Sequence, residues 1–204
     1  MGDDWLPLFP LNTVLFPGGV LPLKVFEARY IDMVRACMKN DAPFGVVLIK
    51  SGSEVGTAAE PEEVGTLAHI IEWDMEKLGV LLLHTKGGQR FRILETRVLP
   101  DQRIEGRIEM QRQDATQPIS DIHVSCAQTL KLVIEDLRSR VEPGAAFDKV
   151  FPQPFKLDDA AWVANRWCEI LPIPLKARQK LLELDDIYSR LSAVHQYLQQ
   201  HKVV

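Results

Sequence analysis

The opening of the chain places short apolar runs between prolines and glycines. Residues 6–30 read LPLFPLNTVLFPGGVLPLKVFEARY, and four prolines separate runs that favour β-strands. Because proline lacks the N–H that a strand donates to its neighbour, these runs should lie at sheet edges or bulges. Pro17-Gly18-Gly19 supplies residues suited to a turn. Residues 14–16 and 20–26 are therefore expected to fold back on each other.

Beyond Phe26 the apolar period changes from two to three or four residues. The apolar positions that carry this period are Tyr30, Met33, Val34, Cys37 and Met38. Such spacing predicts an amphipathic helix over about residues 27–39.

Strand patterns then return. Residues 44–49 form a continuous apolar run, which is typical of a strand covered on both faces, and the polar segment 50–63 predicts an exposed loop. Further strands are expected at 64–73, 78–84, 89–99 and 103–110, with Gly87-Gly88 turning the chain into the third of these. The first half therefore predicts an antiparallel meander.

The second half has helical periods. Residues 111–120 carry no period and predict a boundary between a β part, 1–113, and a helical part, 114–204. Ser120 is a candidate N-cap for a helix of about 20 residues. Its predicted apolar stripe is Ile122, Cys126, Leu130, Val133, Leu137 and Val141.

Three further helices follow from capping residues and prolines. Asp158 or Asp159 can cap a helix that runs to residue 171, and a short helix is expected at 175–184. Asp185 or Asp186 can start the last helix. Its apolar stripe is Ile187, Leu191, Val194 and Leu198. The fold class is therefore α+β, with an antiparallel β part, one early helix and a C-terminal helical bundle.

Composition narrows the function classes. Twenty-four Lys and Arg residues against 28 Asp and Glu residues give a net charge of −4, which provides no bias toward nucleic acid or an anionic membrane. No apolar run reaches the roughly 20 residues of a membrane span. The cysteines, Cys37, Cys126 and Cys168, are scattered, and we expect buried, reduced thiols. A soluble, cytoplasmic protein is expected.

Motifs for catalysis or metal binding do not emerge. The five histidines lack the spacing of a zinc site, and residues 52–56, GSEVG, have their glycines wrongly placed for a nucleophile elbow. There is no G-x-x-x-x-G-K-[ST] phosphate loop. We therefore predict no enzyme activity, no metal and no cofactor.

Basic residues gather over two predicted strands and suggest an alternative function. The candidates for an RNA-binding surface are Lys86, Arg90, Arg92 and Arg107. Glu95, Glu105 and Glu109 are interleaved with them, so cross-strand charge pairs are the ordinary explanation of the pattern.

Several stretches resemble the Lon protease N-terminal domain family. They are LPLFPL at 6–11, VLFPGGVLPLKVFEARY at 14–30, FGVVLI at 44–49, VGTLAHI at 64–70, GGQRFRI at 87–93 and the helical segment 171–191. The resemblance implies a PUA-like β-barrel followed by helices, and a module that recognises protein substrates or unfolded peptide segments. Lon continues into an ATPase and a protease, so a chain that stops at Val204 is expected to be a free-standing member. Glu27, Arg29 and Arg90 fall in matching motifs, and a charge pair that fixes the first helix to the barrel is expected.

Aromatic residues near turns and loops are the candidates for a peptide-binding surface, because side chains there are harder to bury than those in mid-strand. They are Phe16, Trp73, Phe147, Phe151 and Phe155. Packing between barrel and helices is the alternative explanation for all five.

Overall fold

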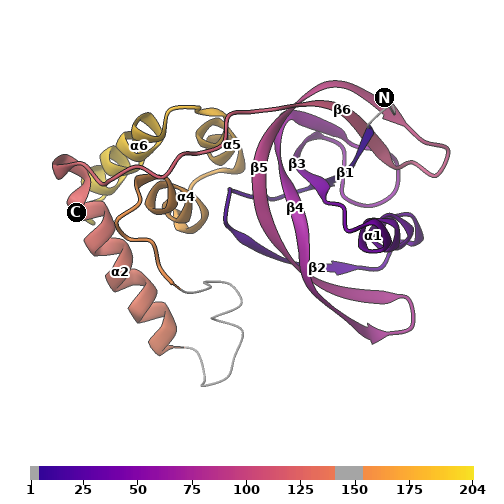
Figure 1. Ribbon diagram of the computed structural model, residues 1–204, viewed down its shortest axis with the longest axis horizontal. Coiled ribbons are helices and arrows are strands. Elements are labelled where there is room, and N and C mark those ends of the chain that lie inside the picture. Colours follow the sequence, from indigo (N-terminus) through magenta and orange to yellow (C-terminus); the bar gives the residue numbers. More distant parts are fainter. Residues whose placement is uncertain (1–4, 141–153) are drawn as a thin grey trace.

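The computed structural model describes residues 5–140 and 154–204, and its sheet and its helical part lie side by side (Figure 1). The six strands are β1 Trp5–Leu11, β2 Val20–Val25, β3 Phe44–Ser51, β4 Glu60–Lys77, β5 Val80–Val98 and β6 Ile104–Met110. Their order is β2-β5-β4-β3-β1-β6, and β6 also pairs with β5, so the pairing returns on itself and forms a ring. β1 and β3 are parallel, unlike the antiparallel arrangement expected throughout. β2 and a helix separate them in sequence, which gives the crossover that a parallel pair needs.

The prolines of β1 lie where that strand has one neighbour. Residues 5–8 pair with β6 and residues 8–11 pair with β3, so Pro7 and Pro10 each have a ladder on one side only. Pro22 lies in β2, which pairs only with β5. These positions confirm the prediction of prolines at sheet edges, where a missing N–H need not cost a ladder bond.

Helix α1, Ala28–Asn40, confirms the predicted early helix. Met33, Val34 and Cys37 are buried on its apolar side, against a cluster that includes Leu81 and Leu83 of β5. α1 therefore covers apolar side chains of the sheet.

Two local predictions in the β part are wrong. Residues 14–16 form no strand, and β2 pairs with β5 rather than folding back on them. Gly87 and Gly88 lie inside the continuous strand β5 instead of in a turn. Gly87 N–H donates to Gly19 O and Gly18 N–H donates to Gly87 O, both at 2.8 Å, so this part of β5 meets the Pro17-Gly18-Gly19 turn.

The helical part contains η1 Asp121–His123, α2 Val124–Ser139, α4 Ala160–Ile170, α5 Leu175–Glu183 and α6 Ile187–Gln200. Asp159 and Asp186 accept the capping N–H bonds of α4 and α6. The α6 stripe is buried as predicted, and so are Cys126 and Leu130 of the α2 stripe, but Ile122 is exposed and Ile134 is more deeply buried than Val133. The 3₁₀ turn at η1 turns His123 inward, and Val141 lies outside the described residues.

One apolar cluster joins the sheet to the helices. Val14, Phe16 and Val64 from the β part are buried together with residues of α2, α4, α5 and α6. The connection after β6 crosses from the sheet to α2 (Figure 1), and the predicted division at residue 113 falls within it. None of the described helices is long and apolar enough to span a membrane.

Candidate functional site

Phe16 is fully buried, which corrects its prediction as an exposed binding residue. The turn that follows it lies against α4. Arg166 Nη1 donates to Gly18 O at 2.7 Å and its Nη2 donates to Pro17 O at 3.0 Å. Because these bonds fix the turn at the helix, Phe16 packs in the cluster that the sheet and the helices share.

Among the residues that the structure describes, the loop aromatics do not form an exposed patch. Phe155 packs against the same shared cluster, with its ring centroid 6.1 Å from that of Trp162. Phe147 and Phe151 lie outside the described residues. For Phe155 the packing explanation therefore fits better than an exposed site.

Trp73 is exposed and has apolar neighbours on its strand. Ile71, Trp73 and Met75, here called the Trp73 strip, have exposed fractions of 55%, 51% and 46%. Trp73 and Met75 alternate along β4 and so share one face, whereas a β-bulge between Ile70 and Glu72 interrupts the alternation at Ile71. Trp73 and Met75 pair with the buried Leu83 and Leu81. Trp73 and Met75 thus continue the face of the sheet that α1 covers.

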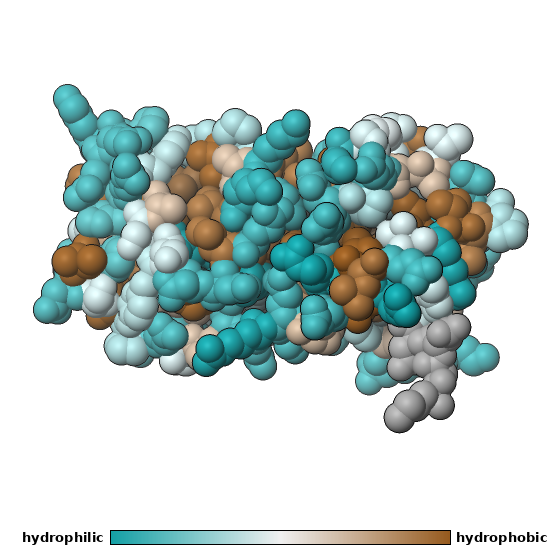
Figure 2. Space-filling model, turned by 90° about the horizontal axis from the view of Figure 1, so that it is seen from above, coloured by the Kyte–Doolittle hydropathy of each residue, from teal (hydrophilic) through white to brown (hydrophobic). Residues whose placement is uncertain are grey.

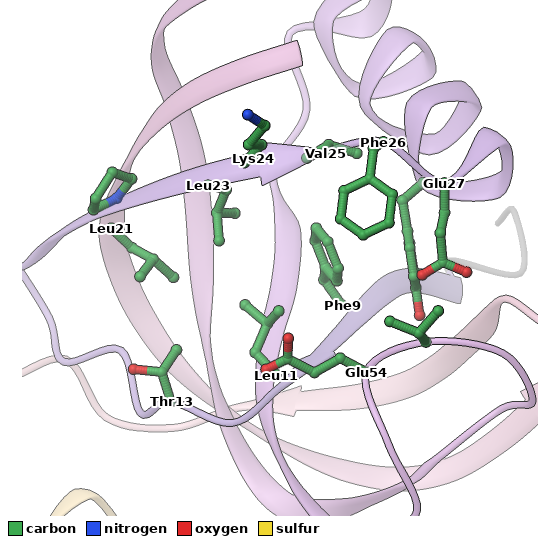
Figure 3. A pocket seen from close by; sticks show the side chains of 13 residues that line it. Phe9, Leu11, Thr13, Leu21, Leu23, Lys24, Val25, Phe26, Glu27 and Glu54 are labelled. Carbon is green, nitrogen blue, oxygen red and sulfur yellow. The ribbon is translucent and has the colours of Figure 1, made fainter. Parts of the chain in front are cut away.

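A hollow lies at each end of α1. A hollow of about 280 Å³ beside its C-terminal end is lined by Cys37, Met38 and two residues of the Trp73 strip. A second, of about 270 Å³, lies by Glu27 and Tyr30 at its N-terminal end, and Figure 3 shows the side chains that line it. On the face seen in Figure 2, apolar residues occur as separate patches among hydrophilic ones.

The arginines proposed for RNA binding are buried or paired. Arg90 is 1% exposed, which removes it from any surface. Arg92 pairs with Glu63 at 3.0 Å, and Arg107 pairs with Glu95 at 3.1 Å. These pairs agree with the cross-strand explanation of the charge pattern. Lys86 is exposed.

Arg90 fixes the helical part to the sheet, not α1. Its Nη1 donates to Leu182 O at 2.8 Å, and its Nη2 lies 3.4 Å from Asp114 Oδ1. The expected role of Arg90 in holding α1 is wrong. Arg29 does that, with Nη1 donating to Gln102 O at 2.8 Å and Nη2 pairing with Glu27 at 3.1 Å. The side-chain alternation of β5 points Arg90 out of the ring, where the helices cover it.

The thiols are poor nucleophiles in this setting. All three cysteines are free and buried. Burial raises the pKa of Cys126 to about 11 and that of Cys168 to about 12, and it also raises the pKa of Cys37. Because the thiolate is the reactive form, these side chains contribute packing rather than chemistry.

Glu169 at the end of α4 is a titratable group in the junction. Its Oε1 lies 2.9 Å from Arg166 Nη2, and its side chain is 24% exposed. Burial raises the pKa of Glu169 to about 7, while Arg166 and Arg178 act in the opposite direction. An acid with a raised pKa in the folded state stabilises the fold while it is protonated. That contribution is complete below the unfolded pKa of about 4.3 and is lost as pH rises through the folded pKa.

Glu169→Gln should therefore change the pH dependence of stability. The wild-type protein should lose about 1 kcal/mol relative to this variant between about pH 5 and about pH 8, after solvent screening is allowed for. Urea unfolding at several pH values in that window measures the difference. Parallel stability curves for the two proteins would contradict the assignment.

Comparisons with known proteins agree with this fold. The chain is 28% identical over 206 residues to a Lon protease of Anaeromyxobacter dehalogenans, covering 98% of this chain and 23% of that protein. It is 31% identical over 100 residues to the protein cereblon of Xenopus tropicalis, covering 47% of this chain.

Solved structures give the same result. The Lon N-terminal domain protein from Xanthomonas campestris matches with a TM-score of 0.74 and 34% identity, over 94% of this chain and 96% of that one. The N-terminal domain of a Mycobacterium avium complex Lon protease has the same fold, with a TM-score of 0.62 and 18% identity over 97% of this chain and 100% of that one. The model of the ATP-dependent protease La (LON) substrate-binding domain matches residues 5–200, and the chain belongs to this family.

Proposed function

We propose that this protein binds apolar segments of other proteins and that the Trp73 strip takes part in the binding. The observation that carries the proposal is the exposure of three large apolar side chains within five residues of β4, beside a hollow at the end of α1. The family is described as substrate-binding, which supports protein substrates as the class of ligand.

The composition of the strip suits this role. Tryptophan and methionine are enriched in the cores of protein interfaces, because both offer a large contact area and methionine adapts its shape to different partners. The proposed activity is binding without catalysis, in agreement with the raised pKa of the thiols. Free buried cysteines also fit a reducing compartment such as the cytoplasm.

Trp73→Ala should weaken binding to a permanently unfolded probe, such as a reduced and alkylated small protein, roughly tenfold. The free energy of unfolding should change by less than about 1 kcal/mol, because half of the side chain is already in solvent. Fluorescence anisotropy with the labelled probe measures the affinity, and urea unfolding measures the stability.

The matched control is Leu132→Ala on α2, since Leu132 is also a large apolar side chain and is 64% exposed. This control should bind the probe as the wild type does. Equal affinities of the wild type and Trp73→Ala for the probe would contradict the assignment of the Trp73 strip as a binding surface. Tighter binding of a single-stranded RNA than of the probe would favour the RNA alternative.

A further inference from the structure

The ring of strands is open at one place. β1 pairs with β6 only through residues 5–8, and its later residues pair with β3 on one side. β2 pairs only with β5, so among residues 5–140 and 154–204 no strand lies between the end of β1 and β2. The hollow at the N-terminal end of α1 occupies this opening. In Figure 3, Phe9 and Leu11 face it from one side and Leu21 and Leu23 face it from the other.

The edge of β2 that borders the opening has unpaired backbone groups. Gly87 N–H donates to Gly19 O, and the register then pairs Val20 with Lys86 and continues residue by residue. Hydrogen bonds alternate along an antiparallel pair, so Leu21, Leu23 and Val25 bond to β5. Val20, Pro22 and Lys24 therefore turn their carbonyls away from β5, and Val20 and Lys24 also turn their N–H groups away.

Pro22 limits what can pair with this edge. A proline on an edge strand removes one donor and disfavours long sheet-to-sheet association between copies of a protein. A short extended segment can still use the remaining carbonyls and the Lys24 N–H. Because the hollow is only about 270 Å³, it has room for one large side chain rather than for several.

The rim of the hollow carries one negative charge that no basic side chain balances. Lys24 pairs with Glu76 at 2.5 Å, and Glu27 pairs with Arg29 at 3.1 Å. The carboxylate of Glu54 accepts the Asn12 N–H at 2.6 Å, and no Lys or Arg of the described residues pairs with it. The pKa of Tyr30, which lines the hollow, is raised first by burial, and Glu27, Asp101 and Glu54 act in the same direction while Arg29 opposes them. The field at the rim therefore favours a cation.

We propose that this opening binds an extended segment of a protein substrate, with one large apolar side chain in the hollow, a Lys or Arg beside Glu54, and the peptide backbone along the free edge of β2. The inference rests on the proposed function and names a second site for it, separate from the Trp73 strip. The site should bind an apolar residue that has a basic neighbour in the peptide more tightly than one that has an acidic neighbour.

Reversing the charge at position 54 tests the preference for a basic neighbour in the peptide. The probes are two labelled, otherwise identical short peptides, in which a central Leu is flanked by Lys in one and by Glu in the other. Wild-type protein should bind the Lys peptide roughly fivefold more tightly, and Glu54→Lys should reverse the order. Glu54→Gln keeps an acceptor for the Asn12 N–H and should abolish the preference. Glu109→Lys on β6 makes the same charge change at another exposed position and should leave the preference unchanged.

The position of the peptide is tested by amide hydrogen exchange on the same samples. Binding of the Lys peptide should slow exchange of the Lys24 N–H, and Phe26→Ala at the rim, where Phe26 is 57% exposed, should weaken binding of both peptides. Thermal unfolding of each variant checks that the fold is intact.

The outcomes separate this inference from the proposed function. If the unfolded probe still binds through Trp73 but Glu54→Lys leaves the peptide preference unchanged, the opening is not the site, and the proposed function stands. If neither the unfolded probe nor either peptide binds, both proposals are wrong.

Discussion

Replacing Arg190 by Ala should lower the free energy of unfolding by about 3–5 kcal/mol, because the substitution leaves a buried carboxylate without its main partner. Arg190 is fully buried, and its Nη1 lies 2.8 Å from Asp114 Oδ2. The side chain of Asp114 is only 6% exposed, and its remaining contacts are longer, at 3.4 Å to Arg90 Nη2 and 3.2 Å to Asn165 Nδ2.

The same substitution also removes contacts that hold three helices together. Arg190 donates to Asn165 Oδ1 at 2.6 Å, to Leu184 O at 2.6 Å and to Leu181 O at 3.0 Å. These acceptors belong to α4, to α5 and to the residue that follows α5, while Arg190 itself lies on α6. An unsatisfied buried acceptor costs about 1–3 kcal/mol. The cost of losing these hydrogen bonds is not added to that of the ion pair, because one side chain makes them all.

Urea unfolding measures the expected loss. The matched control is Arg107→Ala, since Arg107 is also paired, at 3.1 Å with Glu95, but both side chains are more than half exposed at 59% and 52%. This control should change the stability by less than about 1 kcal/mol. If the two variants lose the same amount, the buried network does not stabilise the junction as argued.

The features that sequence alone predicted well are those set by local periodicity. The stripe of Ile187, Leu191, Val194 and Leu198 is buried as its spacing indicated, and the caps at Asp159 and Asp186 lie where expected. In each case the signal comes from residues within one or two turns of each other. The early helix and the long apolar strand β3 were predictable for the same reason.

The features that sequence alone missed depend on contacts between distant parts of the chain. Phe16 lies beside a turn, and Arg90 lies on an outward strand face. Side chains in both kinds of position are normally exposed. The helices that begin at Ala160 cover them, and no local pattern shows that these helices dock there. For the candidate site, the sequence predicts Trp73 at the end of a strand, but β4 continues past it to Lys77, and the opening beside β2 depends on how the strands pair around the ring.

Gly87→Ala should destabilise the protein by about 2–3 kcal/mol, as expected when an added methyl group meets atoms that cannot move away. A Cβ at this position would lie too close to the backbone carbonyl oxygen of Phe16. That carbonyl belongs to the turn that bonds to Gly87 on one side and to Arg166 on the other. Gly-Gly suggested a turn in the sequence, but at Gly87 the missing side chain lets another turn approach the strand.

The neighbouring glycine provides the control. A Cβ at Gly88 would meet the His69 ring, at 2.8 Å from Nε2, and a side-chain ring can rotate away whereas a hydrogen-bonded turn cannot. Gly88→Ala should therefore cost less than about 1 kcal/mol, well below the cost at Gly87. Neither glycine has a positive φ, so left-handed backbone strain does not enter the comparison. Urea unfolding of both variants decides the matter: equal losses would mean that the approach of the Phe16 carbonyl does not explain the glycine at position 87.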